Sequence, residues 1–366
     1  MKIARARGWV KRGWAAGKHC VRGGEGVEYQ QDQPRSSIPS EGEMNKLSRR
    51  AVLRAGIGLV AGAAALRSSA FELLGAERHS REGNPDLQFP SAPRERLAVA
   101  SWPFRAEIAS AANEYRDKKR PAMDLRDFAV SVRERFGVPG VEPLSAHFPS
   151  TDERYLRGFR EAIDRAGVHV VDIPVDNEFS FYDPDAGNRK KAIENGKKWV
   201  DVAVVLGSPS VRTSIAEAQK AKPNVDVAAQ SIRELVDYAA DKKILVNLEN
   251  DNLVSEDAFF VVKVIEKANH PWLHALPDFC NSMASGNEKF NYEAVTAMFR
   301  HAYNICHVKD SEVGEGGKVF RVDLQRTFGI LKASGYRGYC SMEWEGPEDP
   351  YVGTKKLIAA SLEYLS

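Results

Sequence analysis

Several features that would assign a protein to a class are scarce in this chain of 366 residues. The apolar run at residues 55–66 is too short to span a membrane. Glycines at positions 56, 58 and 62 nearly match a dinucleotide-binding loop, but the third glycine is misplaced and no β-strand pattern precedes it. We therefore expect neither a stable membrane span nor a nucleotide held by that loop.

Cysteine is also scarce, with four residues in the chain. Cys20 lies near the N-terminus, whereas Cys280, Cys306 and Cys340 fall in or beside separate strand-like runs. An odd number of cysteines in the body of the chain argues against a disulfide framework. Buried thiols are the expectation for all three.

The net charge is small and unevenly placed. It is formally +2, yet residues 1–70 carry 13 Lys and Arg against 5 Asp and Glu, which leaves 39 against 45 for the remainder. The basic character therefore belongs to the N-terminal segment. The acidic remainder gives no electrostatic reason to expect nucleic acid as a partner.

The N-terminal segment resembles a twin-arginine export signal. Arg49 and Arg50 precede a short, weakly apolar run, and small residues between 68 and 76 suit a cleavage site. With Met44 as a second start, residues 44–76 form the signal, 1–43 a disordered extension or an over-long start, 77–96 a linker and 97–366 the body. The resemblance implies export by the twin-arginine translocation machinery to a periplasmic or extracellular location. The alternative is a chance arginine pair before a core helix.

From residue 97 onward, short apolar or β-branched runs alternate with longer stretches of helical periodicity. This alternation is typical of βα units around a parallel sheet. Eight runs start 28 to 42 residues apart, which is the length that a strand, a helix and two loops need. They cover residues 97–103, 138–143, 168–175, 210–215, 244–249, 272–278, 304–310 and 339–343. The pattern predicts a single α/β domain, a (β/α)₈ TIM barrel, in preference to an open doubly wound sheet.

Two of the intervening helices have clear boundaries in the sequence. Apolar residues recur on one helical face between 125 and 136, with Asp124 as a candidate N-cap and Gly137 as a stop. A similar arrangement begins at Asp323 and ends at Gly335, before the last strand.

Metal-binding side chain types end the last four predicted strands: Glu249, Asp278, His307 and Glu343. In such barrels the chemistry lies at the C-terminal ends of the strands. Parallel neighbours are about 4.8 Å apart, so inward-pointing side chains at one height can converge on one ion. Three carboxylates and one imidazole favour Mn²⁺, with Mg²⁺, Co²⁺ and Zn²⁺ as alternatives. Taken singly, a carboxylate at such a position is more often a solvated strand-end residue, and a lone histidine is more often a hydrogen-bonded structural residue.

These four strand ends resemble the ligand set of the xylose-isomerase-like family of sugar isomerases and epimerases. The segment His307-Val308-Lys309-Asp310, the glycine-rich loop at 314–317 and the Gly335-Tyr336-Arg337-Gly338 lead into the last strand are similar to that family. The resemblance covers nearly all of residues 97–365. It implies one divalent ion that binds neighbouring sugar oxygens and stabilises the enediolate left when an α-proton departs.

The resemblance also implies roles for individual residues. Glu249 and Glu343 would serve as the base and acid on opposite faces of the substrate. Lys309 would steady a developing oxyanion, unless it is a solvated rim lysine. Arg212, Glu142 and His147 lie at or just beyond other strand ends and are candidate substrate contacts, unless they are ordinary rim or salt-bridge residues. A further candidate is Asn281. It occupies a position where many sugar epimerases carry a histidine, and because an amide cannot carry a proton as imidazole does, the familiar ketose epimerisation is in doubt.

The leading functional hypothesis is a metal-dependent isomerase or epimerase acting on a non-phosphorylated sugar or keto-sugar, since phosphorylated sugars are chiefly cytosolic. The runner-up is a lyase or dehydratase that begins with the same proton abstraction and eliminates an oxygen substituent from a keto-sugar, keto-glycoside or inosose. A non-catalytic carbohydrate-binding barrel is a third hypothesis. The fourth, an endonuclease, would need more metal-binding histidines than the seven that follow Met44, and a basic surface. A homo-oligomer is compatible with each of these hypotheses.

Overall fold

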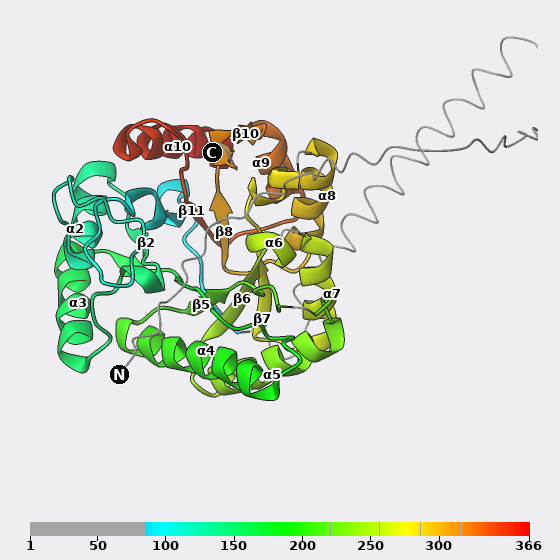
Figure 1. Ribbon diagram of the computed structural model, residues 1–366. Helices are drawn as coiled ribbons and strands as arrows, with labels where there is room; N and C mark the ends of the chain where they lie inside the picture. The colour runs from blue at the N-terminus through cyan, green and yellow to red at the C-terminus, as the bar shows by residue number, and fades with distance from the viewer. Residues whose placement is uncertain (1–84, 220, 256, 286, 315–316) are drawn as a thin grey trace, which may run out of the picture. The chain divides into compact units, whose positions relative to one another are not determined.

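The computed structural model describes residues 85–366 except 220, 256, 286, 315 and 316, and within this part the chain forms a TIM barrel. The predicted N-terminal extension and export signal, residues 1–76, lie outside the described residues. Figure 1 shows the strands at the centre and the longer helices around them.

The strands of the barrel begin and end close to the eight predicted runs. They are β1 (Leu97–Ala100), β2 (Gly140–Glu142), β3 (His169–Val170), β4 (Ile173–Val175), β5 (Ser210–Thr213), β6 (Leu245–Glu249), β7 (Leu273–Leu276), β8 (Ile305–Val308) and β11 (Tyr339–Met342). The third predicted run, 168–175, is divided into β3 and β4, because the chain changes its pairing partner from β2 to β5 within it.

All of these strands pair in parallel. One sheet has the order β3-β2-β1-β11-β8, and the other has the order β4-β5-β6-β7. The shared run of β3 and β4 joins the sheets on one side, and single parallel bridges between Ala275 and Ala302 and between Asp278 and His307 join β7 to β8 on the other. The eight predicted units therefore close into a barrel, which confirms the fold expected from the sequence.

A short antiparallel hairpin was not predicted. It consists of β9 (Ser311–Val313) and β10 (Val319–Arg321), which lie on either side of the glycine-rich segment 314–317. Each strand has only three residues, and β10 is largely exposed, so neither forms an apolar run that the sequence pattern would reveal. The hairpin places residues just beyond β8 over the C-terminal end of the barrel, where the predicted chemistry lies.

Each of the eight longer helices begins after an Asp or Asn whose side chain accepts a backbone N–H of the first turn, which satisfies a group that the helix itself leaves unpaired. These helices are α2 (Leu125–Phe136), α3 (Glu153–Ala166), α4 (Ala186–Leu206), α5 (Val225–Asp241), α7 (Ala258–Ala268), α8 (Glu288–Phe299), α9 (Leu324–Ala333) and α10 (Pro350–Leu365). A short helix, α6 (Asn252–Ser255), follows β6. As predicted, Asp124 caps α2, and Gly137 ends it with a φ of 63°.

The apolar residues form two separate clusters. The larger one lies between the strands and the helices, and α3 contributes Leu156, Phe159 and Ile163 to it. The smaller one comprises Ala98, Val171, Leu276 and Ile305, which come from four different strand segments. A strand alternates its side chains between two faces, so the second cluster fills the inside of the barrel. The polar ends of the strands are thus supported from below by packed apolar side chains.

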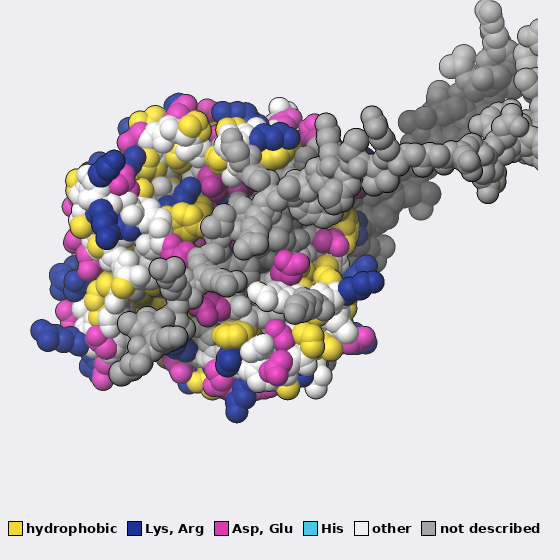
Figure 2. Space-filling view, viewed as in Figure 1, with side chains coloured by type: hydrophobic (Ala, Val, Ile, Leu, Met, Phe, Trp, Pro, Cys, Tyr) yellow, Lys and Arg dark blue, Asp and Glu magenta, His cyan; other side chains and the backbone are white. Residues whose placement is uncertain are grey.

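Three further observations concern the surface and the thiols. Within residues 85–366 and their stated gaps, no helix combines the length and apolar character that a membrane crossing needs. On the described part of the face shown in Figure 2, acidic and basic side chains are interspersed. Cys280, Cys306 and Cys340 are buried and free, as expected from the sequence.

Candidate metal centre

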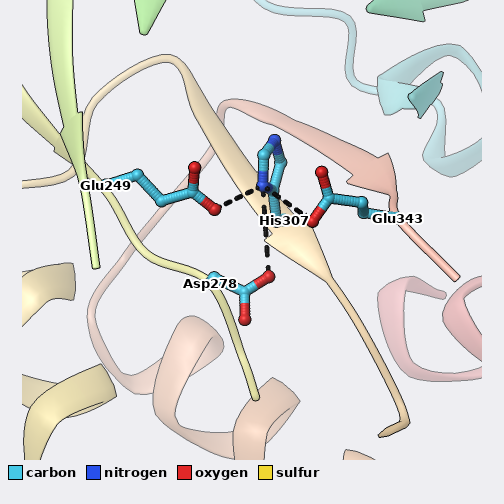
Figure 3. Close-up of side chains that lie close together, drawn as sticks. All are labelled: Glu249, Asp278, His307 and Glu343. Carbon is cyan, nitrogen blue, oxygen red and sulfur yellow. Dashed lines mark hydrogen bonds and ion pairs between the residues drawn. The ribbon is translucent and has the colours of Figure 1, made fainter. Parts of the chain in front are cut away.

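Four strand ends bring their side chains to one point at the C-terminal end of the barrel. Glu249 is the last residue of β6, Asp278 lies two residues beyond β7, His307 lies in β8, and Glu343 directly follows β11. Each offers one donor atom, these atoms lie within 4.8 Å of one another, and all four residues are buried. Figure 3 shows the side chains directed toward a common centre. The structure thus brings together the four donors that the sequence suggested.

Strand alternation explains why these side chains point inward. In β8, Ile305 belongs to the cluster inside the barrel, whereas Cys306 and Val308 belong to the outer cluster under the helices. His307 shares the parity of Ile305 and therefore faces the interior. A shift of one residue in the register of β8 would exchange the histidine for a thiol.

The backbone around Asp278 orients its carboxylate. Its Oδ1 accepts hydrogen bonds from the backbone N–H groups of Cys280 at 2.8 Å and Asn281 at 2.6 Å, while its own N–H donates to Oδ1 of Asn250 at 2.8 Å. Its Oδ2 is buried and has no hydrogen-bond partner in the described part of the chain. One oxygen is therefore fixed by the protein, and the other is directed to the centre.

His307 is held from behind by a buried carboxylate. Its Nε2 donates to Oε1 of Glu142 at 2.8 Å, and the other oxygen of Glu142 accepts from the hydroxyl of Ser341. The opposite ring nitrogen, Nδ1, faces the centre and lies 2.8 Å from Oε1 of Glu249. A carboxylate that receives one ring N–H leaves the other nitrogen to bind a metal. Glu142 thus supports a donor, and whether it also contacts a substrate stays a prediction.

Burial alone would lower the pKa of His307, but the carboxylates of Glu142, Glu343 and Glu249 raise it well above its usual value. The surrounding carboxylates therefore favour a positive charge at this position. A divalent ion at Nδ1 would supply that charge.

Arg212 of β5 neutralises one of the donors. Its Nε lies 2.7 Å from Oε2 of Glu249, and the side chain is almost fully buried. Its Nη1 lies 3.8 Å from a carboxylate oxygen of Asp176 and 3.8 Å from one of Asp251. The guanidinium thus lies among three carboxylates beside the centre. Its predicted contact with a substrate remains untested by this arrangement.

Lys309 and Asn281 lie on the other side of the centre. The Nζ of Lys309 is 3.0 Å from Oε2 of Glu343 and donates to Oδ1 of Asn281 at 2.9 Å. The amide of Asn281 in turn donates to Oε1 of Glu249 at 3.3 Å. Burial alone would raise the pKa of Glu343, but His307, Lys309 and Arg212 hold it at about 2. Glu343 is consequently ionised at neutral pH.

His147 lies apart from these donors, in a short 3₁₀ helix (Ser145–His147) that follows β2. Its Nδ1 is 2.8 Å from the hydroxyl oxygen of Ser101, and the ring is fully buried. Burial and the charge of Arg105 lower the pKa of His147 to about 3. The ring is therefore neutral at physiological pH, and its role as a substrate contact stays a prediction.

Sequence reasoning did not identify two acidic residues beside the centre. Glu312 in β9 lies 3.0 Å from Nζ of Lys309, and Glu345 lies 3.7 Å from it. Glu345 follows Glu343 by two residues, so strand parity could have pointed to it. Glu312 depends on the hairpin of β9 and β10, for which the sequence offered no clear signal.

The four donors fit a divalent ion. Ligands about 2.2 Å from one ion are separated by at most about 4.4 Å, close to the spread of these atoms. Oxygen and imidazole donors are the types that Mg²⁺, Mn²⁺ and related ions accept. The buried Oδ2 of Asp278 lacks a hydrogen-bond partner within the described residues, so an ion would supply an electrostatic partner.

Several solved structures have the same fold. One is a xylose isomerase-like TIM barrel protein from Mycobacterium smegmatis in complex with magnesium, 17% identical, covering 74% of this chain and 97% of its own, with a TM-score of 0.55. A second is D-psicose 3-epimerase with D-tagatose from Clostridium cellulolyticum H10, 14% identical, covering 73% and 97%, with a TM-score of 0.56. A third is the probable 3-DHS dehydratase AsbF of petrobactin synthesis from Bacillus anthracis, 14% identical, covering 72% and 97%, with a TM-score of 0.55.

At these identities the likeness shows the fold alone. No curated protein matches the chain. The model of one protein family, described as the xylose isomerase-like TIM barrel, matches residues 132–366, and this segment contains all four donors. The chain therefore belongs to the xylose isomerase-like TIM barrel family.

Proposed function

We propose that this protein is an enzyme that removes a proton from the carbon next to the carbonyl of a non-phosphorylated sugar or keto-sugar and returns it, as an isomerase or epimerase. The convergence of Glu249, Asp278, His307 and Glu343 within 4.8 Å carries this proposal. These residues would hold one divalent ion, with Mn²⁺ favoured. The ion, when bound, would polarise the carbonyl and stabilise negative charge on neighbouring sugar oxygens.

The carboxylates of Glu249 and Glu343 would move the proton. They approach the centre from β6 and from the end of β11, on different sides of His307, as Figure 3 shows. A substrate carbon between them would meet one carboxylate on each face, which the exchange of an α-proton requires. Lys309 would place its ammonium beside the developing oxyanion, since Nζ lies 3.0 Å from Oε2 of Glu343.

The charge of the site supports an uncharged substrate. Two buried cations, Arg212 and Lys309, lie among a larger number of carboxylates. Those within 4.0 Å of one or the other cation are Asp176, Glu249, Asp251, Asp278, Glu312, Glu343 and Glu345. A divalent ion would leave this site negative, and a phosphoryl group would be repelled.

A lyase is the second candidate function, and the chemistry of Asn281 supports it. The amide is held by Glu249 and Lys309, and it cannot carry a proton between the faces of a substrate. Proton return to carbon would then depend on the two glutamates alone, whereas elimination of an oxygen substituent needs only one abstraction. The likeness in fold to a probable dehydratase is compatible with this second outcome.

A glutamate replacement tests the proton-transfer role. Glu343→Gln keeps the shape and one oxygen donor but removes the base. We expect partial retention of the ion and a fall in solvent-deuterium exchange into bound keto-sugar by roughly 10² to 10⁴-fold, the contribution of a positioned acid or base. Proton NMR of a sugar panel in D₂O measures this exchange.

Glu153→Gln is the control, because it makes the same chemical change at an exposed carboxylate of α3, outside the site. It should retain exchange within about tenfold of the unmodified protein. Near-normal exchange in Glu343→Gln would contradict the two-carboxylate mechanism. Loss of water or an aglycone from the product would identify a lyase, and binding without any exchange would identify a non-catalytic barrel.

We also propose that residues 44–76 direct export by the twin-arginine route. Because that route reads paired arginines and carries folded cargo, Arg49→Lys with Arg50→Lys should leave the full chain in the cytoplasm. Cell fractionation measures the distribution, and a version beginning near Phe71 serves as the folded, non-exported control. Export of the double variant at the unmodified level would refute the signal.

A further inference from the structure

The ammonium group of Lys309 lies in a nearly complete shell of oxygen atoms. Three oxygens lie 2.9 to 3.0 Å from Nζ and two more lie 3.7 and 3.9 Å away. They belong to Asn281, Glu312, Glu343, Glu345 and Asp278. We call these five residues the oxygen cage. The lysine side chain is 4% exposed, so the cage replaces the water that an ammonium normally retains.

The composition of the cage is that of a site for a hard cation. Four carboxylates and one amide oxygen are donors of the kind that Ca²⁺, Mg²⁺ and Mn²⁺ take in proteins. Burial alone would lower the pKa of Lys309, but Asp278, Glu312 and Glu343 raise it well above its usual value. The side chain therefore carries a permanent positive charge.

The cage also adjoins the candidate metal centre. Asp278 and Glu343 belong to both groups, and the buried Oδ2 of Asp278, which has no hydrogen-bond partner within the described residues, lies 3.9 Å from Nζ. Glu312 and Glu345, by contrast, belong to the cage alone. The two positions are thus neighbours that share carboxylates, as in sites that hold two metal ions about 3.5 to 4 Å apart.

We propose that Lys309 fills a second cation position, and that its ammonium limits the centre to one exchangeable ion. The tethered group supplies the charge that a second divalent ion would otherwise supply. This inference rests on the four-donor site of the proposed function for its neighbouring ion. It concerns how many ions the protein binds, which can be measured without any catalytic assay.

The test opens the cage without disturbing the other donors. Lys309→Ala removes the ammonium and leaves room, so the variant should bind one more Mn²⁺ per chain than the unmodified protein. Elemental analysis of the gel-filtered protein gives the count. Electron paramagnetic resonance gives the geometry, since two Mn²⁺ ions this close couple magnetically, whereas a single ion gives an isolated six-line spectrum.

Two control variants locate the added ion. Lys309→Met removes the charge but fills the space with a side chain of similar length, so it should gain no ion. Lys309→Ala with Glu312→Gln replaces a charged carboxylate of the cage, one that is not a donor of the first centre, with a weaker neutral amide, so it should lose the added ion and keep the first. Should repulsion prevent the alanine variant from folding, it is prepared in the presence of Mn²⁺, whose binding in the cage would replace the lost positive charge, and the same gain is expected.

An unchanged count with an isolated spectrum in folded Lys309→Ala would overturn the inference. A gain in Lys309→Met, or a gain that survives Glu312→Gln, would also overturn it, because the ion would then lie elsewhere. The proposed function fails separately, if the unmodified protein binds no ion. The inference is tested by the difference in ion count between Lys309→Ala and the unmodified protein, so the two failures are distinguishable.

Discussion

The two halves of the barrel end their strands in different ways. On one side, β6, β7, β8 and β11 provide the four donors of the candidate metal centre. On the other side, β2 and β5 provide Glu142 and Arg212, which face donors and not the point where the donors meet. Both sets are buried and charged. The difference is that each of the four donors directs an atom to the shared centre, whereas Glu142 and Arg212 hold donor side chains in place.

This difference indicates how the site is organised. Glu142 orients the ring of His307, and Arg212 neutralises one oxygen of Glu249. A donor without such support would be free to rotate or to take up a proton, and a buried charge left alone is costly. We therefore expect substitutions to fall into an ordered series. Losses at donors should be largest, losses at supporting residues smaller, and losses elsewhere in the barrel interior smallest.

The largest effect is expected at the donors themselves. Asp278→Ala or His307→Ala should reduce bound divalent ion from close to one to below about 0.1 per chain, because affinity falls steeply when a ligand is lost. Elemental analysis after gel filtration measures this. Asn250→Ala is a useful comparison, since its side chain contacts Asp278 only through the backbone. Full occupancy in both donor variants would place the ion, if one binds, at another site.

A smaller effect is expected at the supporting carboxylate. Glu142→Ala should weaken Mn²⁺ binding by about 10- to 100-fold, because the ring of His307 loses the partner that fixes its orientation. The dissociation constant is obtained by titrating the protein with Mn²⁺ and measuring the electron paramagnetic resonance signal of the unbound ion. Ser341→Ala removes the other hydrogen bond of Glu142 but leaves the histidine paired, so it should have a lesser effect. Equal affinities for Glu142→Ala and the unmodified protein would mean that the two halves do not differ as described.

The smallest effect on ion binding is expected at Asp172, a buried residue between β3 and β4. Its carboxylate accepts from Ser210 and from Asn247 and contacts none of the four donors. Burial and the charge of Glu142 raise the pKa of Asp172 to about 7. Asp172→Asn should change Mn²⁺ affinity by less than about threefold, since a group outside the ligand set contributes little.

Asp172 should instead affect how stability depends on pH. Its folded pKa lies above that of an unfolded aspartate, so the native state keeps a proton that the unfolded chain releases, and stability falls as pH rises from about 4 to about 7. Asp172→Asn abolishes this loss. The free energy of unfolding of the variant, relative to that of the unmodified protein, should therefore be higher at pH 8 than at pH 4 by on the order of 1 to 3 kcal/mol. Urea unfolding at the two pH values measures it. A variant whose advantage is the same at both would show that Asp172 does not titrate in this range.

The sequence by itself determined the framework of this protein. Eight apolar runs at regular spacing predict the barrel, and Asp124 and Asp323 mark where α2 and α9 begin. The four donors could be named because a strand end is a local property. Parallel strands place their C-terminal ends at one rim, so polar residues that end apolar runs must gather there.

Only the tertiary structure decided which residues support the donors. Glu142 lies 165 residues before His307, and Ser341 lies 199 residues after Glu142. These contacts depend on the closure of the barrel and on the stagger of its strands, which no local pattern specifies. The position of Glu312 in the oxygen cage likewise depends on the hairpin of β9 and β10, whose strands are too short to form a recognisable pattern. Local periodicity records which face a side chain occupies, whereas the partner across a barrel is fixed only when distant strands meet.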